Sequence, residues 1–490
     1  MAVTPNTWIV QFNEGAGTSG DLAFELRERG AVIRFMYPNA ILGFSAIIEN
    51  EDLLDELRVD PRVKSIEQDE DPQIQWLGMG PPITNDTLVA MGVGWSVEAG
   101  EHGVAIPKPW QLDRICKSNP VLDNVHKFRY TGNGVYIYYF DTGVNPHSDF
   151  GGTSRLVDLW CDPAWAPETS ALVDLGHHGS VGAGCCAGST VGVARDAIIV
   201  ASRLGLGGIA EMLDMLDTAL THYNALPSGT RACANFSYAG FLWSQALEDA
   251  YVALWDAGIV LVAAGGNAVE LDHYNVLPQK LQSLGKMIIA GASSGLCGPP
   301  GSDAHYANLR PFTPFIQNNV GVLEGIDPYS ARGDWVDIYA PSNCTTVSPN
   351  YNNPSYHPLY SVAQPYPSAL TEWDRTSLGT SFASPMTCGV LALLLEEFPT
   401  ATPEEIRTLL LDRSTPSLVG LEDTLYGNQC HNRMLTNCQN LWDETTQVSE
   451  IVSANAKSDT TVVKGKWYRW RVRRTTGNLI NGEWSETALW

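Results

Sequence analysis

The chain has 490 residues, of which 44% are hydrophobic and 17% are charged, so it can bury a large core and does not belong to the disordered class. Its formal net charge of −24 disfavours duplex nucleic acid, whose phosphates must be neutralised by lysine and arginine, so we expect no nucleic-acid partner. We find no run of about 18 apolar residues and therefore expect no membrane span. The first residues lack the basic start and apolar core of a signal peptide.

The first 72 residues predict a small α+β domain. Strand-like apolar runs and two helical patterns alternate there, and the second helical pattern begins with acidic residues and ends at Pro61. The order β-α-β-β-α-β is the ferredoxin-like plan. The predicted elements are a strand at 7–14, a helix at 20–29, strands at 31–37 and 41–49, a helix at 51–61 and a strand at 62–70.

A larger α/β domain is predicted for residues 110–415. Apolar strand-like runs alternate with amphipathic helical patterns, which indicates a mostly parallel sheet with helices on both faces. Ligand sites in such sheets lie at the carboxyl ends of the strands. Residues 73–109 are rich in proline and glycine and read as a linker, and residues 416–490 form an extension of unknown role. The clearest strand-like runs are 134–141, 197–204, 232–239, 258–265 and 286–293, and the helical patterns are 210–224 and 243–258.

Four residues in this domain have the chemistry that peptide hydrolysis by a serine requires: an acid, a base, an oxyanion donor and a nucleophile. Asp141 ends an apolar strand at a glycine turn, and His178 precedes small residues that allow a helix to begin close to the sheet. Asn267 follows a buried strand, and its amide can donate to an oxyanion. Ser381 lies where a loop enters an apolar helix.

Each of these residues also has a purely structural interpretation. Asp141 could be a turn residue, Asn267 a loop residue in the left-handed conformation, and Ser381 a helix N-cap. Pro385 fits the first turn of the helix that Ser381 enters. His177 and His178 could suggest a metal pair, but adjacent residues do not face each other on a helix, so we expect His177 to be structural.

Taken together, the segments resemble the subtilisin-like serine peptidases, most closely the proteinase K branch. The order Asp141, His178, Ser381 is the order of that family's triad. The family's active-site signatures resemble the Asp-Thr-Gly-Val run at 141–144, His-Gly-Ser at 178–180 and Gly-Thr-Ser-Phe-Ala-Ser-Pro at 379–385. Residues 7–70 resemble its inhibitory prodomain, so the resemblance covers 1–72 and 110–415.

The resemblance implies a role for each site residue. Ser381 would be the nucleophile, His178 the general base and then the acid, and Asp141 the group that orients the imidazole. Asn267 and the Ser381 amide would bind the oxyanion. Five further positions would bind an extended peptide as an added strand: Ser237, Tyr238 and Ala239, with Gly207 and Gly208 near the opposing strand.

The resemblance further implies a secreted, monomeric serine endopeptidase that acts on proteins or peptides. Residues 1–72 would be its intramolecular inhibitor, 73–109 a linker with the processing site, and 110–415 the peptidase domain. No cofactor is expected; structural calcium is possible in such a family, but we identify no ligands for it and assign no metal. The alternative is an inactive protein of the same fold with a binding or regulatory role, which the complete set of site residues disfavours.

Several features depart from the family or stay open. Gly182 replaces a residue that is often β-branched or cysteine, which we expect to loosen its helix, and Ala239 replaces a common glycine and would narrow the substrate pocket. The insert at 342–375 is longer than usual and could form a wall of the cleft. Among ten cysteines, Cys430 and Cys438 could form a disulfide. The basic and aromatic run at 464–474 could bind polyanions or form a twisted strand.

Overall fold

The computed structural model describes most of the first 300 residues and shorter segments beyond them. The described residues are 4–15, 19–72, 74–76, 97–99, 105–107, 110–116, 126, 128–167, 169–174, 176–205, 207–240, 243–267, 276–297, 316–317, 323–326, 330–342, 344–347, 373–375, 379–416, 433–436, 469–473 and 484–488. Most of the predicted linker, of the 342–375 insert and of the tail, with Cys430 and Cys438, lies outside them. No helix in the described part of the chain is both long enough and apolar enough to span a bilayer.

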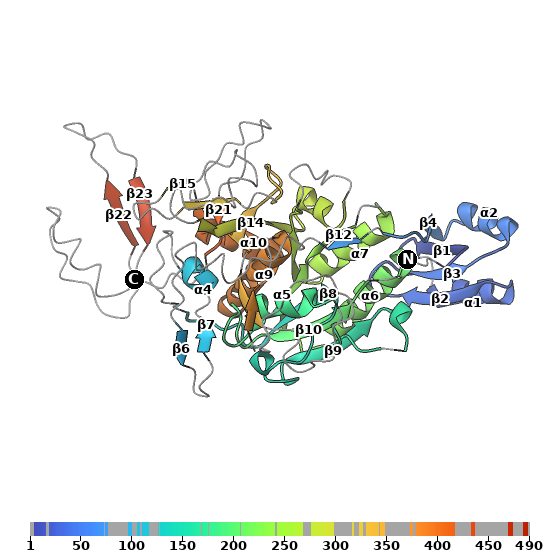
Figure 1. The fold of residues 1–490 in the computed structure, drawn as a ribbon. Coiled ribbons are helices and arrows are strands. Elements are labelled where there is room, and N and C mark those ends of the chain that lie inside the picture. Colours follow the sequence, from blue (N-terminus) through green and yellow to red (C-terminus); the bar gives the residue numbers. More distant parts are fainter. Residues whose placement is uncertain are drawn as a thin grey trace. The chain divides into compact units, whose positions relative to one another are not determined.

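The N-terminal module, residues 4–72, has the predicted β-α-β-β-α-β order (Figure 1). Its four strands form an antiparallel sheet in the order β2-β3-β1-β4, and its two helices bury Leu22, Leu26, Leu53 and Leu57 against that sheet. The Asn50 side chain accepts a hydrogen bond from the Asp52 amide and so caps the second helix. The elements are β1 Thr7–Phe12, α1 Ser19–Glu28, β2 Val32–Tyr37, β3 Gly43–Ile47, α2 Glu51–Val59 and β4 Val63–Gln68.

The larger domain is built on a mostly parallel sheet in the order β20-β21-β17-β14-β13-β11-β8-β10-β9. The pairs from β9 to β21 along this path are parallel, and only the short β20 joins it antiparallel. The strands on the path are β8 Val135–Asp141, β9 Leu156–Cys161, β10 Ile198–Arg203, β11 Arg231–Phe236, β13 Ile259–Ala264, β14 Ile288–Cys297, β17 Ile338–Pro341, β20 Thr415–Pro416 and β21 Arg433–Met434; β15 Ile316–Gln317 and β16 Leu323–Ile326 pair beside β14.

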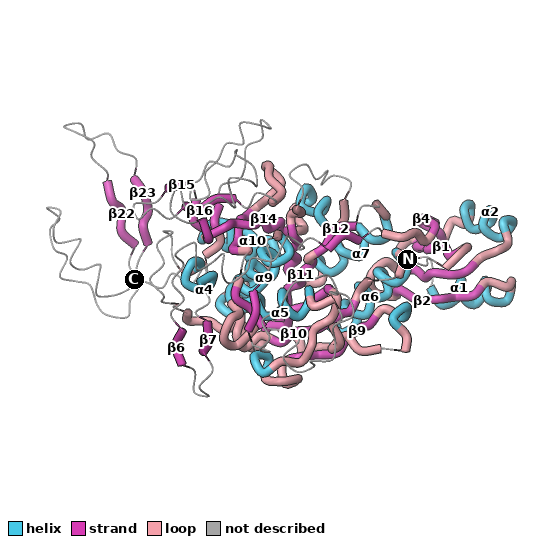
Figure 2. Tube along the Cα trace, viewed as in Figure 1, coloured by secondary structure: helices cyan, strands magenta, loops and turns pink. Residues whose placement is uncertain are grey.

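Helices cover this sheet on both faces (Figure 2). Helices α5 and α9 pack against each other and against β8, whereas α6 and α7 pack against each other and against β9 and β13. Because helices shield both faces, all six residues of β13 are buried, as the continuous apolar run predicted. The helices are α4 Trp110–Ile115, α5 His178–Ala187, α6 Ile209–Ala225, α7 Gln245–Asp256, α9 Thr380–Glu397 and α10 Pro403–Arg413, with short 3-10 helices η1 Ser148–Phe150, η2 Pro163–Trp165 and η4 Gln279–Leu284.

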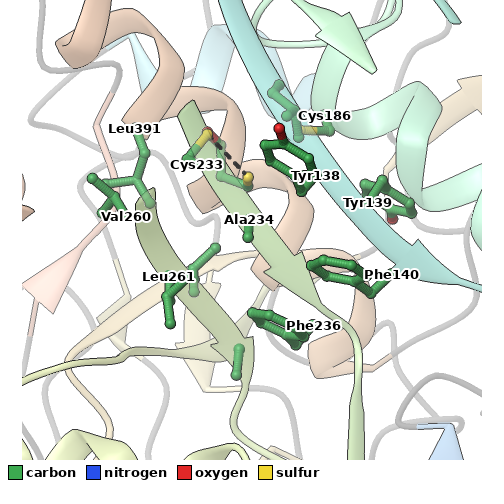
Figure 3. Packing of buried hydrophobic residues seen from close by; sticks show 14 of the residues in the cluster. Tyr138, Tyr139, Phe140, Cys186, Cys233, Ala234, Phe236, Val260, Leu261 and Leu391 are labelled. Carbon is green, nitrogen blue, oxygen red and sulfur yellow. Dashed lines mark hydrogen bonds between the residues drawn. The ribbon is translucent and has the colours of Figure 1, made fainter. Parts of the chain in front are cut away.

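The centre of the core lies between the strands that lead to the predicted site (Figure 3). Phe140 at the end of β8 stacks on Phe236 at the end of β11, with ring centroids 4.9 Å apart. The Sγ atoms of Cys233 on β11 and Cys388 on α9 are 3.5 Å apart, and the cysteines that the structure describes with their side chains are free thiols. This packing fixes the carboxyl ends of β8 and β11 next to each other.

In the described part of the chain, eight short strands form four pairs outside the main sheets, and one pair bears on the predicted substrate strand. Strand β5 Ile74–Trp76, which follows the N-terminal module, pairs antiparallel with β12 Tyr238–Gly240. Strands β6 Val97–Ala99 and β7 Ala105–Pro107 form a hairpin, as do β18 Thr345–Val347 and β19 Trp373–Arg375. The compact unit 440–490 contains β22 Arg469–Arg473 and β23 Trp484–Ala488, so the basic and aromatic run forms a strand in part.

Candidate active site

The Asp141 carboxylate holds the His178 ring. Asp141 is the last residue of β8 and is fully buried, and its Oδ1 lies 2.8 Å from His178 Nδ1. The same oxygen accepts from the Thr142 amide at 2.8 Å. A carboxylate only accepts hydrogen bonds, so Nδ1 of the neutral imidazole carries the proton and Nε2 is its basic nitrogen. This tautomer is the one that a general base next to a serine requires.

The charges around His178 favour its protonated form. Burial lowers the pKa of the imidazole, but the negative charge of Asp141, the hydrogen bond to it and the nearby Asp174 outweigh burial, so the pKa lies above its ordinary value. A base with a raised pKa binds a proton readily when the serine releases one. The two carboxylates therefore increase the basicity of the group that would activate Ser381.

Asp174 is a residue of the site that the sequence analysis missed. It is buried four positions before His178, and its carboxylate accepts from Thr142 Oγ1 at 2.7 Å and from the Ser180 amide at 2.7 Å. Thr142 Oγ1 in turn accepts from the Gly179 amide at 2.9 Å. These bonds satisfy amides of the first turn of α5 and fix the helix relative to the end of β8. The only sequence signal was an acid close to the histidine.

The first turn of α5 leaves no room for larger side chains. A Cβ on Gly179 would lie 2.0 Å from the Gly143 carbonyl oxygen, so the residue after His178 must be glycine. His177 caps the helix with a φ of 62°, a left-handed conformation that few non-glycine residues adopt. His177 therefore lies just outside the helix, and the expectation that it is structural stays a prediction.

Ser381 lies at the start of α9 and is held by Ser237 through two reciprocal hydrogen bonds. The Ser381 hydroxyl donates to the Ser237 carbonyl at 3.0 Å, and the Ser237 hydroxyl donates to the Ser381 carbonyl at 2.9 Å. Ser381 is the second residue of the helix, and Gly379, with a φ of 154°, occupies the N-cap position instead. The N-cap interpretation of Ser381 is therefore wrong.

The placement of Pro385 in the first helical turn is also wrong, because α9 begins at Thr380 and Pro385 lies inside it. A proline has no amide proton, so it cannot bond to the carbonyl four residues earlier, which belongs to Ser381. That carbonyl accepts from the Ser237 hydroxyl instead. Pro385 thus leaves the Ser381 carbonyl available to Ser237, the residue between β11 and β12.

Ser381 and His178 approach each other through neighbouring residues. The ring of Phe382, next to Ser381, has its centroid 5.4 Å from that of His178. The Ser381 hydroxyl donates to the Ser237 carbonyl, so it must leave that acceptor before it can donate to the imidazole. Such bonds are often loose in the absence of substrate and tighten when substrate is bound.

Asn267 presents its amide group to the start of α9. Its Oδ1 accepts from the Thr380 amide at 2.9 Å and from Thr380 Oγ1 at 3.0 Å. Because Oδ1 accepts these two hydrogen bonds, Nδ2 is the atom of this side chain that can donate to an oxyanion. The Gly266 amide also donates to Thr380 Oγ1, at 2.9 Å, so β13 and α9 hold each other in this position. The arrangement suits the binding of an oxyanion formed at Ser381.

The predicted substrate-binding residues divide into two groups. Tyr238 and Ala239 are buried, and the strand that contains them is paired with β5; the hydroxyl of Tyr238 bonds to that of Tyr251 in the core. The amides of Gly207 and Gly208 donate to Asp162 Oδ2 at 2.7 Å and to Glu211 Oε2 at 2.9 Å. Those two amides are therefore engaged within the protein and are not open to substrate.

The structure offers no evidence for a bound metal ion within its described part. Among those residues, no three His, Cys, Asp or Glu side chains form a group that could hold one.

Comparison with known proteins gives the family. The sequence model of the subtilase family (Peptidase_S8) matches residues 132–429, and this range includes all four predicted catalytic residues. The chain belongs to the subtilase family. Among subtilases, it is 26% identical to the alkaline serine exoprotease A of Vibrio alginolyticus over 79% of this chain and 58% of that protein. It is 27% identical to the extracellular serine proteinase of Thermus sp. (strain Rt41A) over 80% of this chain and 75% of that protein.

Solved structures of subtilases share the fold. A cold-adapted subtilisin-like serine proteinase matches with a TM-score of 0.50 and 26% identity, over 68% of this chain and 98% of its own. Fervidolysin from Fervidobacterium pennivorans matches with a TM-score of 0.57 over 88% of this chain and 60% of its own, and at 17% identity this likeness concerns the fold alone. The α/β fold predicted from the sequence is confirmed.

Proposed function

We propose that this chain is a secreted serine endopeptidase that hydrolyses peptide bonds through an acyl-enzyme and is made as a self-processing zymogen. The observation that carries the proposal is the 2.8 Å bond between Asp141 and His178 beside the start of α9, where Ser381 lies. Membership of the subtilase family and the serine proteinase names of its relatives support the same activity. The extracellular relative supports secretion.

The proposed reaction is acyl transfer to Ser381 followed by hydrolysis of the acyl-enzyme. The Ser381 hydroxyl passes its proton to His178 Nε2 while Oγ bonds to the carbonyl carbon of the substrate, and Asp141 stabilises the imidazolium. Asn267 Nδ2 and the Ser381 amide donate to the oxyanion. As the intermediate collapses, His178 returns the proton to the leaving amine and the acyl-enzyme remains. Water then attacks the ester with His178 as its base, and Ser381 is regenerated.

The zymogen part of the proposal is supported by the contacts of the N-terminal module. Glu67 accepts from the Ser244 hydroxyl at 2.7 Å and from the Ala246 amide at 3.0 Å, at the start of α7. Asp69 accepts from the Ala210 amide at 3.0 Å, at the start of α6. Both acids accept from amides of a first helical turn, which have no partner within the helix. From there the chain continues into β5, which pairs with the predicted substrate strand as a bound peptide would.

A serine-directed fluorophosphonate tests the activity. We expect the processed protein to be labelled on Ser381 and to cleave casein, and we expect Ser381→Ala to lose both labelling and about 10⁶-fold in turnover. The matched control is Ser384→Ala, which removes a buried hydroxyl that bonds to Asn235 and is not part of the proposed triad. A folded protein that is neither labelled nor active would identify the chain as an inactive subtilase.

Self-processing has its own test. The purified chain should cut itself between residues 73 and 109, whereas Ser381→Ala should remain full length; intact mass and N-terminal sequencing measure both. Equal cutting of the two proteins in isolation would show that another peptidase performs the step.

A further inference from the structure

A buried arginine beside the predicted triad has no hydrogen-bond acceptor. Arg203 is the last residue of β10 and is 0% exposed, yet its Nε and both terminal nitrogens have no hydrogen-bond partner. Its backbone lies level with Asp141 across the β8–β10 pair, and the next amide, that of Leu204, donates to the Asp141 carbonyl at 2.8 Å. A buried, unpaired guanidinium is strongly destabilising unless an anion joins it.

The group stacked on this guanidinium adds another donor and no acceptor. The Arg203 guanidinium carbon lies 4.3 Å from the ring centroid of Trp165, and the buried Trp165 Nε1 also has no hydrogen-bond partner. Among the carboxylates at the neighbouring strand ends, Asp141 Oδ1 bonds to His178, and Asp162 accepts from the Gly207 and Ala164 amides. The buried Asp141 Oδ2 has no hydrogen-bond partner either, so it does not pair with the guanidinium. Four buried nitrogens that can only donate thus lie together, and a carboxylate, with two planar oxygens, matches the guanidinium fork.

The position of Arg203 indicates which side of a substrate would reach it. Arg203 begins the segment that runs to Gly208, where the Ile209 amide donates to the Glu70 carbonyl at 3.1 Å. From Glu70 the chain continues to β5, which pairs with β12 in the direction that leads toward Ser237 and Ser381. If a substrate follows this path, the residues before its scissile bond pass between the 203–208 segment and β12. Arg203 lies at the end of that segment nearer to Asp141.

We propose that Arg203 and Trp165 form a subsite for the carboxylate of an aspartate or glutamate side chain in the substrate, at one of the four positions before the scissile bond. This inference rests on the proposed endopeptidase activity. The half-buried Trp165 side chain lies over the guanidinium. The proposal requires it to turn aside when the acidic side chain enters. The substrate carboxylate then accepts from Arg203, and the buried charge is paired.

Matched peptides test the subsite. In one neutral peptide, glutamate replaces glutamine at each of the four positions in turn, and kcat/KM is measured for the processed wild type. We expect the Glu/Gln ratio of kcat/KM to reach about 10- to 100-fold at one position, the range for hydrogen bonds to a charged group. Arg203→Met should bring that ratio to one or below, and Arg203→Lys should keep part of it. Lys286→Met, which removes a charge just before β14 at the amino end of the sheet, should leave the ratio unchanged.

The outcomes separate the inference from the function on which it rests. Hydrolysis of the neutral peptides with a wild-type Glu/Gln ratio near one at all four positions overturns the subsite and leaves the peptidase intact. If no peptide is cut, the proposed function fails and the subsite fails with it. If sodium acetate or phosphate raises the melting temperature of the wild type but not of Arg203→Met, and glutamate is not preferred, the arginine binds a free anion and the subsite is overturned. Should Arg203→Met not fold, the wild-type and Arg203→Lys ratios decide.

Discussion

At the scale of single residues, Asn267 combines two functions in one amide. Its Oδ1 holds the Thr380 amide, and its Nδ2 is the proposed oxyanion donor. Asn267→Asp keeps the acceptor and replaces the donor, so we expect kcat to fall by at least about 10²-fold while the melting temperature stays close to that of the wild type. Asn267→Ala should lower both, because Thr380 then loses its acceptor. An Asp variant with unchanged kcat would remove Asn267 from the oxyanion site.

Asp174 should influence the pH dependence of the proposed base. Its charge contributes to the raised pKa of His178, so Asp174→Asn should lower that pKa. Because His178 must be neutral to act as a base, the acid limb of kcat/KM should move to lower pH. The lost acceptor at the Ser180 amide should also cost about 1–3 kcal/mol of folding stability. A limb that stays in place or moves to higher pH, in a folded variant, would contradict the assignment.

The sequence indicated the reactive groups of the site but not the groups that hold them. Asp141, His178, Asn267 and Ser381 lie in short motifs with a recognisable order, and so they could be predicted. Asp174 could not, because its role depends on contacts with Thr142 and the α5 amides that exist only after folding.

At the scale of the elements, Gly182 fits α5 against β8. A Cβ there would lie 2.1 Å from Tyr139 Oη, so the glycine makes room for the tyrosine, which gives it a packing role that the expected loosening of the helix did not consider. We expect Gly182→Ala to destabilise the fold by about 1–3 kcal/mol through overpacking. Denaturant unfolding measures this change in free energy.

The adjoining tyrosine offers a matched control. The buried Tyr139 hydroxyl has no hydrogen-bond partner, so Tyr139→Phe alone should cost little. Combined with Gly182→Ala, it removes the atom that the new methyl group meets, and the double variant should regain most of the lost stability. Additive losses would show that the helix itself, and not the contact with Tyr139, requires glycine.

The apolar patterns predicted the type of these elements better than their ends. The run 232–239 was predicted as one strand, but β11 ends at Phe236 and β12 begins at Tyr238. The interruption is Ser237, whose hydroxyl and carbonyl both bond to Ser381. No local pattern shows this, because the bonded residues are far apart in the sequence.

At the scale of the whole molecule, charged groups join the N-terminal module to the larger domain. Arg34 of the module bonds to Glu211 at 2.5 Å and lies 3.4 Å from Asp69. The Asp217 carboxylate accepts from the Asn39 and Ala40 amides at 2.7 Å, and Lys64 pairs with Asp249 at 2.5 Å. Several of these acids change their solvation when the module docks, so docking should depend on pH.

Asp69 sets the direction of that dependence. Burial against α6 is the largest effect and raises its pKa to about 6, Glu211 acts in the same direction, and the Ala210 amide and Arg34 oppose it. An acid whose pKa is higher in the docked state takes up a proton on docking, so the interface is strongest when Asp69 is protonated. The affinity of the module should therefore weaken by about tenfold or more as the pH rises from about 4 to 6, and Asp69 should contribute no further change above that range.

Native mass spectrometry of the self-processed complex between pH 4 and 8 measures the bound fraction of the module. Asp69→Asn cannot ionise and should flatten most of the change, while Asp217, whose pKa burial also raises, should leave a smaller change in the same direction. Asp249 acts in the opposite sense, since its lowered pKa makes its pairing weaken only in more acidic solution. Tighter binding as the pH rises from 4 to 6 would show that pairs such as Lys64 with Asp249, and not the buried Asp69, govern release of the module.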